Sequence, residues 1–112
     1  PEGIKLSPDG QYVAVTLING TNRATGDPFF NEKGKLVILK RAGNQLTRVA
    51  DADIGRWCQG IAWSKDSKTV LAQCMVEEEI FAFRLSGITS KSLQRLQSIK
   101  TKGGPAGIRT AE

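Results

Sequence analysis

Few residues in this chain are of a type that does chemistry. Its 112 residues include no histidine and only two cysteines. The lack of histidine removes imidazole acid–base catalysis, histidine metal ligands and any Ser-His-Asp triad from the chain itself. Two cysteines alone do not build a zinc cluster. We therefore predict no catalytic residue, no metal ion and no cofactor for this chain alone.

Aromatic side chains stand beside charged ones in the segment Asn19–Gly34, which is expected to be a long loop. It contains Asp27 close to the adjacent pair Phe29 and Phe30. Exposed aromatic groups beside charges are typical of recognition sites, and long loops on a rigid scaffold often carry function. The alternative is that both rings fold back over the core of their own sheet.

A second group of candidate residues lies in the segment Asp51–Gln59, which is expected to be a loop before a strand. Arg56 and Trp57 stand near its end, and Asp51 and Asp53 near its start. Arg56 is a candidate for contact with a ligand. Trp57 either faces the same ligand or packs between neighbouring sheets.

Cys58 and Cys74 lie on either side of the turn Lys65–Ser67. If this turn closes a tight antiparallel hairpin, the two cysteines lie opposite or beside each other, within disulfide range. A disulfide would indicate an exported protein. The alternative is two reduced, buried thiols that act as small hydrophobic groups.

Charge is spread along most of the chain. The net charge is +5, but the lysines and arginines are scattered, which is typical of a solvated surface and predicts no nucleic-acid partner. The only tight run of charge, Glu77–Glu79, is more typical of a solvated turn than of a Ca²⁺ site. No apolar stretch reaches the roughly 18 to 20 residues of a membrane-spanning helix.

An internal repeat organises these residues. The pattern Gly-Ile-x-x-Ser-x-Asp begins at Gly3 and recurs at Gly60 with identical offsets, followed each time by residues typical of strands. A third start appears at Gly107 and is then cut off. Intervals near 40 to 50 residues are typical of the four-stranded blades of β-propellers.

Each repeat unit is predicted to contain four strands. The expected strands are Gly3–Ser7, Gln11–Ile18, Lys35–Arg41 and Gln45–Ala50 in the first unit, and Gly60–Ser64, Thr69–Val76, Ile80–Leu85 and Leu93–Ile99 in the second. No segment has a sustained helical period, and a single helical turn is considered only near Thr89–Leu93. In a propeller, the long loop Asn19–Gly34 and the segment Asp51–Gln59 lie at the same pole.

Both faces of the middle strands are apolar. In Gln11–Ile18, one face carries Tyr12 and Ala14, and the other carries Val13 and Val15. A sheet of a two-layer sandwich buries one face only, whereas stacked blades cover both. We therefore predict an all-β fold of antiparallel four-stranded propeller blades, with two blades and the start of a third. The expected boundaries are 1–52, 53–101 and 102–112.

The turn Ser7-Pro8-Asp9-Gly10 within its repeat, and the segment Gly103–Ile108 before the third start, resemble the repeats of YVTN/lactonase-like and amine-dehydrogenase-like β-propellers. The resemblance implies a larger propeller, usually of about seven blades. The expected partners are therefore other blades, from the same polypeptide or from other copies, because one repeat cannot bury its own apolar faces.

The function expected from these features is that of a binding or interaction scaffold whose recognition surface lies at the pole of the two loops. The ligand, a protein or a small molecule at the axial pole, is expected to contact Arg56, Trp57, Phe29, Phe30 and Asp27. The resemblance also implies two alternatives, a fragment of a lactonase-like hydrolase and a docking platform of a redox enzyme. The expected compartment is the periplasm or the exterior, with the cytoplasm as the alternative.

Overall fold

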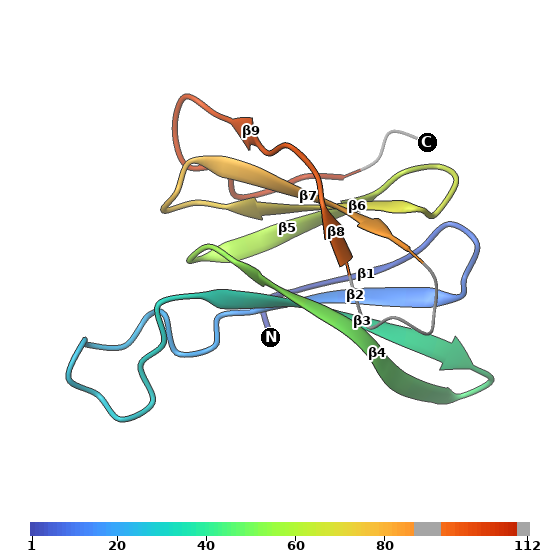
Figure 1. Ribbon diagram of the computed structural model, residues 1–112, viewed down its shortest axis with the longest axis horizontal. Coiled ribbons are helices and arrows are strands. Elements are labelled where there is room, and N and C mark those ends of the chain that lie inside the picture. Colours follow the sequence, from blue (N-terminus) through green and yellow to red (C-terminus); the bar gives the residue numbers. More distant parts are fainter. Residues whose placement is uncertain (87–92, 110–112) are drawn as a thin grey trace.

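The computed structural model describes residues 1–86 and 93–109, which form two antiparallel sheets (Figure 1). The first sheet contains β1 (Gly3–Leu6), β2 (Tyr12–Leu17), β3 (Gly34–Ala42) and β4 (Gln45–Ile54). The second contains β5 (Cys58–Trp63), β6 (Thr69–Cys74), β7 (Glu79–Leu85), β8 (Leu93–Arg95) and β9 (Ile99–Lys100). Within the described residues there is no helix, so the predicted all-β class is confirmed.

The strand order follows the sequence in both sheets. The order is β1-β2-β3-β4 in the first sheet and β5-β6-β7-β8 in the second, where β9 also pairs with β7. The strand predicted over Leu93–Ile99 is therefore two short strands, both paired with β7. The helical turn considered near Thr89–Leu93 lies outside the described residues, apart from Leu93, which begins β8.

The β4 strand is longer than predicted, because it runs on to Ile54 instead of ending at Ala50. It pairs with β3 up to the pair Gly34↔Ile54, with one shift in the register between Ile38 and Leu39. Ala50 and Ala52 pack against the core, while Asp51 and Asp53 alternate with them. This is the period-2 pattern of a strand with one solvated face, which the turn-like composition of the segment concealed.

The core lies between the two sheets, which stack face to face (Figure 1). The first sheet contributes Leu36 and Ile38, and the second contributes Val70 and Phe83, all of them almost fully buried. Burying side chains of this size contributes roughly 1.5–3 kcal/mol each. The indole N–H of Trp63 donates a hydrogen bond across the interface between the sheets.

The hydrogen bond between the two sheets joins Trp63 Nε1 to the carbonyl oxygen of Lys5 at 3.1 Å. The opposite face of the first sheet is apolar as well, but no sheet formed by the described residues covers it. Its central side chains Val13 and Val37 are buried by their neighbours, whereas Ile4 on β1 is 71% exposed. The second sheet thus covers one face of the first, and cover of the other face by a further blade stays a prediction.

The turn between β1 and β2 is built by side chains. The Ser7 hydroxyl donates to Asp9 Oδ1 at 2.6 Å and accepts the backbone N–H of Tyr12 at 3.0 Å. The same aspartate oxygen accepts the N–H of Gln11 at 3.0 Å. Gly10 has a φ of 73°, a conformation that glycine adopts at little cost.

The turn between β5 and β6 repeats this network. Ser64 donates to Asp66 at 2.6 Å and accepts the N–H of Thr69 at 2.9 Å. Ser67 stands where the first unit has its glycine and has a φ of 62°. Its hydroxyl accepts the backbone N–H of Asp9 at 3.0 Å, so this residue joins the turns of the two units.

The repeated glycine lies where neighbouring units approach most closely. A Cβ atom at Gly3 would collide with the carbonyl oxygen of Gln59, next to the second repeat glycine. A Cβ atom at Gly60 would meet the backbone nitrogen of Ile108 at 3.0 Å, next to the third. The first strand of each unit therefore lies against the start of the next, and glycine leaves the space for it.

Candidate functional site: one end of the two sheets

Three connections meet at one end of the sheets, which is called the loop pole below (Figure 1). They are residues 18–33 between β2 and β3, residues 55–57 between β4 and β5, and residues 75–78 between β6 and β7. The opposite end carries the two Ser-x-Asp turns and is called the turn pole. The two loops predicted to share one pole therefore do so.

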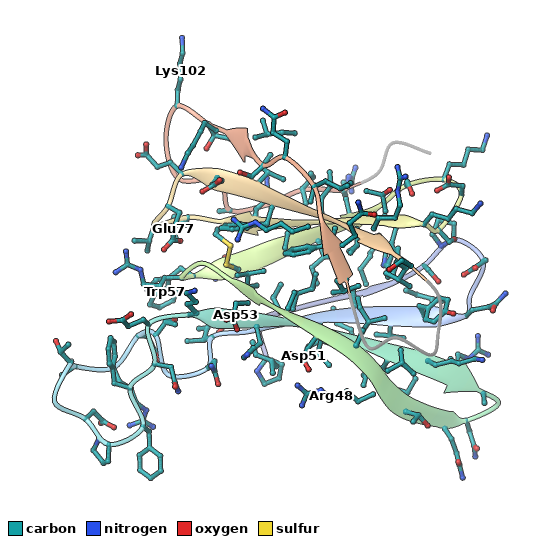
Figure 2. The ribbon with its side chains drawn as sticks, viewed as in Figure 1. Arg48, Asp51, Asp53, Trp57, Glu77 and Lys102 are labelled. Carbon is teal, nitrogen blue, oxygen red and sulfur yellow. A yellow bond between two sulfur atoms is a disulfide. The ribbon has the colours of Figure 1, made fainter. Side chains whose placement is uncertain are left out.

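The second of these connections is much shorter than predicted, since Asp51 and Asp53 belong to β4. Both make ion pairs on the sheet surface (Figure 2), Asp53 with Lys35 at 2.5 Å and Asp51 with Arg48 at 2.6 Å. The hydrogen bond from Lys35 lowers the pKa of Asp53. These pairs are largely solvated, so each contributes little to stability.

The long loop is cross-linked by its own side chains. The amide nitrogen of Asn19 donates to the carbonyl oxygen of Lys33 at 3.0 Å, and that of Asn31 donates to the carbonyl oxygen of Asn19 at 2.9 Å. Asn19 itself has a φ of 57°, in the left-handed region where asparagine is among the better tolerated residues. The base of the loop is thus fixed at both ends.

Asp27 organises the tip of this loop. Its carboxylate accepts the N–H of Phe29 at 2.7 Å and pairs with Arg23 at 3.2 Å. The pKa of Asp27 is lowered, chiefly by the Phe29 hydrogen bond. Phe29 is 69% exposed, with the Arg23 guanidinium 5.5 Å from its ring centre, so the interpretation that it folds back over the core is wrong. Phe30 is half-buried and lines a cleft.

The short connection presents Arg56 and Trp57 at the loop pole. Glu77 holds this turn: its carboxylate accepts the backbone N–H of Arg56 at 2.7 Å and the side-chain Nε–H at 2.9 Å. Trp57 has a φ of 53° and is 38% exposed. Its carbonyl oxygen accepts the N–H of Met75 at 3.2 Å, and Figure 2 shows Trp57 and Glu77 at the same end of the molecule.

A disulfide joins Cys58 and Cys74 directly behind this turn. The two residues face each other in the β5–β6 register with their Cα atoms 4.0 Å apart, and both are buried. Of the two states considered from the sequence, the disulfide is the one found. It lies beside Trp57 in the chain and therefore anchors the first strand of the second unit at the loop pole.

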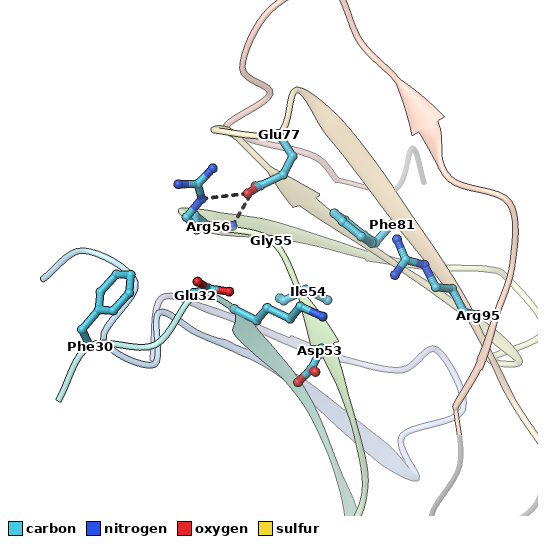
Figure 3. Close-up of a pocket in the computed structure, with 10 residues that line it drawn as sticks. Phe30, Glu32, Asp53, Ile54, Gly55, Arg56, Glu77, Phe81 and Arg95 are labelled. Carbon is cyan, nitrogen blue, oxygen red and sulfur yellow. Dashed lines mark hydrogen bonds and ion pairs between the residues drawn. The ribbon is translucent and has the colours of Figure 1, made fainter. Parts of the chain in front are cut away.

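A cleft of about 440 Å³ opens between the two sheets at the loop pole (Figure 3). Its floor includes Ile54 and Phe81, which are 2% and 5% exposed. The Arg95 guanidinium lies 4.6 Å from the ring centre of Phe81. The lining also includes Phe30, Glu32, Lys33, Arg56 and Glu77.

The structure brings Phe30 and Arg56 to one cleft and places Trp57 next to it in the chain, whereas Asp27 and Phe29 lie on the outer part of the loop. Glu77 and Arg95 were missed as candidates from the sequence. Glu77 was assigned to a solvated run, and nothing in the local pattern around Arg95 indicates that β8 borders the cleft. The ligand roles of all these residues stay predictions.

The carboxylates of Glu77 and Glu79 in the acidic run do not converge on one site. Glu77 bonds to the Arg56 turn, whereas Glu79 begins β7, accepts a hydrogen bond from Ser98 and pairs with Lys100 at 3.0 Å. Within residues 1–86 and 93–109, no three cysteine or carboxylate side chains are placed to hold a metal ion. Over the same residues, no helix has the length and apolar character to cross a membrane.

Comparison with known proteins identifies the fold. No protein-family model matches the sequence, and no curated protein matches it. Among solved structures, the chain is similar to a putative 6-phosphogluconolactonase from Bacteroides fragilis, with a TM-score of 0.70 and 23% sequence identity. The match covers 95% of this chain and 27% of that one. The chain therefore has the fold of part of a lactonase-like β-propeller.

Proposed function

We propose that the chain provides two blades of a β-propeller that acts as a binding scaffold, with the loop pole as its recognition surface. The observation that carries this proposal is the conformation of Trp57. A bulky residue with positive φ is strained, at a cost on the order of 1–3 kcal/mol, and such residues cluster at ligand-binding sites. The φ of Trp57 is 53°.

The surroundings of Trp57 maintain this strained turn. Glu77 bonds to the residue before it, the Met75 N–H bonds to its own carbonyl oxygen, and the Cys58–Cys74 disulfide fixes the residue after it. Three separate constraints therefore keep a half-exposed indole at the loop pole. A tryptophan serving only the core would be buried like Trp63, which is 3% exposed.

The long loop supplies a second exposed aromatic group. Phe29 lies on an internally hydrogen-bonded loop, with Arg23 over its ring and Asp27 bonded to its backbone. Aromatic and arginine side chains are enriched where protein interfaces hold most of their binding energy, and a pre-ordered loop loses little entropy on binding. A protein ligand that spans both loops fits this surface best.

The division of the chain into blades is part of the proposal. We assign 1–52 and 53–101 to the two blades, and 102–112 to the linker and first strand of a third. The approach of Ile108 to Gly60 supports the third start, because it matches the approach of Gln59 to Gly3. Further blades of the same kind would cover the open apolar face that carries Ile4.

The disulfide supports an oxidising compartment for the protein. Cys58 and Cys74 are bonded to each other and leave no free cysteine in the described part of the chain. We therefore place the protein in the periplasm or outside the cell. Labelling of free thiols in freshly isolated full-length protein tests this, because a cytoplasmic protein would present both thiols in reduced form.

Affinity capture with the full-length protein tests the recognition surface. Proteins retained by the wild type are expected to be lost with Trp57→Ala and strongly reduced with Phe29→Ala. Leu46→Ala is the matched control, since Leu46 is a 51% exposed apolar residue outside the loop pole. Unchanged capture by Trp57→Ala, with wild-type circular dichroism, would refute the proposal.

A second candidate function is hydrolysis of a small lactone. The support is the similarity to a chain whose name is that of a 6-phosphogluconolactonase. Turnover of a lactone panel by the full-length protein, lost on Arg56→Ala, would favour this function. Retained capture without turnover would favour the scaffold.

A further inference from the structure

We propose that the cleft at the loop pole binds a carboxylate attached to an apolar group, and that Arg95 holds the carboxylate. This inference rests on the proposed recognition surface and names the ligand chemistry of its cleft. It joins two features, an arginine that makes no ion pair with residues 1–86 or 93–109 and an apolar floor beside it. Arg95 lies on β8, and the floor comes from Ile54 at the end of β4 and Phe81 on β7.

The first feature is the position of the Arg95 guanidinium. Its central carbon lies over the ring of Phe81, 4.6 Å from the ring centre, and Figure 3 shows it beside that ring, across the cleft from Phe30 and Glu32. This cation–π contact involves no hydrogen bond, so it leaves the guanidinium N–H groups available. Those N–H groups match the two oxygens of a carboxylate, which favours a bidentate pair.

Other cationic side chains near the cleft already have ion-pair partners. Arg56 is bonded to Glu77 at 2.9 Å, and Lys35 to Asp53 at 2.5 Å. The Arg95 guanidinium, in contrast, has no side-chain hydrogen bond or ion pair with any residue that the structure describes. The pairs Arg56–Glu77 and Lys35–Asp53 are each neutral. The charged residues that remain in the lining are Arg95, Lys33 and Glu32, which together carry a net positive charge.

Glu79 is the carboxylate on which the charge of Arg95 acts, but it is already satisfied. The Ser98 hydroxyl and the Lys100 ammonium bond to it, and these hydrogen bonds are the main reason that the pKa of Glu79 is lowered. The charge of Arg95 is the least of the causes. The N–H groups of Arg95 therefore remain for a ligand.

The floor of the cleft indicates the rest of the ligand. Ile54 and Phe81 are nearly buried, and half-buried Phe30 comes from the long loop. A volume of about 440 Å³ lies in the range of pockets for small organic ligands. An aromatic or aliphatic group of that size would cover this apolar floor while its carboxylate reaches Arg95.

Calorimetric titration of the full-length protein with three small probes tests the chemistry. Phenylacetate has both groups, phenylacetamide lacks the charge, and acetate lacks the apolar part. We expect phenylacetate to bind at least about tenfold more tightly than either other probe, because a charge-assisted pair and burial of the ring act together. Arg95→Gln should weaken phenylacetate binding about tenfold or more.

Arg84→Gln is the matched control, because Arg84 lies on β7 with an exposed side chain and does not line the cleft. It should bind phenylacetate as the wild type does. Equal binding of phenylacetamide, or unchanged binding of phenylacetate by Arg95→Gln, would overturn the proposal, as would no binding of any probe that carries both groups.

The carboxylate source is settled by a peptide that ends in phenylalanine, used with a free carboxyl end and as its amide. Preferential binding of the free-acid peptide over phenylacetate supports a chain terminus as ligand, and the reverse supports a small molecule. If Trp57→Ala abolishes protein capture while Arg95→Gln binds every probe like the wild type, the cleft chemistry fails and the recognition surface stands.

Discussion

The two units close their first hairpins alike and connect their second and third strands differently. At the turn pole, Ser7 with Asp9 and Ser64 with Asp66 make the same set of hydrogen bonds. At the loop pole, the first unit has the long connection 18–33, whereas the second has the short turn 75–78. The second unit also carries the disulfide, which the first lacks.

The turn pole is therefore the same in both units, whereas the loop pole varies between them. Hairpin turns that recur with the same atoms in both units serve the fold, because each must pair its strands in the same register. Connections that differ between units are free of that requirement, and function on repeated scaffolds commonly lies there. The exposed aromatic residues Phe29 and Trp57 are both at the loop pole.

The one deviation at the turn pole joins the units. Ser67 replaces the glycine of the first turn, keeps a positive φ, and accepts the N–H of Asp9. A hydroxyl thus compensates for a conformation that glycine would adopt more easily. The turn pole is therefore a point of attachment between units as well as a hairpin end.

Removing the disulfide should have the largest effect and should affect the units unequally. Cys58→Ala with Cys74→Ala is expected to lower the free energy of unfolding by about 3 kcal/mol, since the bond closes a separation of 16 residues. Urea unfolding of the full-length protein measures this. Hydrogen exchange should rise in β5 and β6 before β1 and β2.

Reduction of the wild type by dithiothreitol should reproduce the loss, whereas the double variant should not respond to the reductant. A loss below about 1 kcal/mol, or equal exchange in the two hairpins, would contradict the unequal role of the disulfide.

Removing the turn serines should lower the free energy of unfolding by a smaller amount, and the loss should be larger for the more buried serine. Ser7→Ala is expected to cost about 1–2 kcal/mol, because it removes the hydroxyl that accepts the N–H of Tyr12 in a site closed to water and that donates to Asp9. Ser7 is 2% exposed. Ser64→Ala should cost less, because Ser64 is only half-buried and water can replace its hydroxyl. Urea midpoints that rank the two variants in the opposite order would contradict the dependence on burial.

Titration of the two turn aspartates should give the smallest effect. The pKa values of Asp9 and Asp66 are both lowered, chiefly by the serine hydroxyl of their own turn. The folded state therefore favours the carboxylate, and this stabilisation is present above the unfolded pKa of about 3.9. It is lost as the pH falls through the lower folded value.

Asp9→Asn and Asp66→Asn should each reduce the decline in stability between about pH 5 and pH 3, by similar amounts. Urea unfolding at several pH values measures the decline. If only one variant reduces the decline in stability with falling pH, the two turns differ in electrostatic role although they are alike in geometry.

Much of the fold was predictable, because it follows from local pattern. The Ser-x-Asp turns fix where hairpins bend, and counting outward from Lys65–Ser67 places Cys58 opposite Cys74, as found. The interpretation of Asp51 and Asp53 as loop residues was wrong. Their polar side chains suggested a turn, whereas pairing with β3 extends the strand.

The candidate site was predictable only in part. Arg56, Trp57, Phe29 and Phe30 were identified as loop residues, but their exposure depends on neighbours that no short window contains. Glu77 engages Arg56 from a different hairpin. The side chain of Arg95 reaches the cleft only because β8 pairs with β7 alongside Phe81.

The sequence by itself determined the repeat, the hairpin turns, the two-faced apolar strands and the spacing of the cysteines, because these depend on residues close together in the chain or in fixed register. Only the tertiary structure decided which side chains share the cleft, that Trp57 is held in a strained, half-exposed conformation, and which face of the first sheet is covered. The cleft and the covered face depend on how one sheet stacks on the other, and the conformation of Trp57 depends on contacts from the β6–β7 turn and the disulfide. These contacts join residues that the local pattern does not relate.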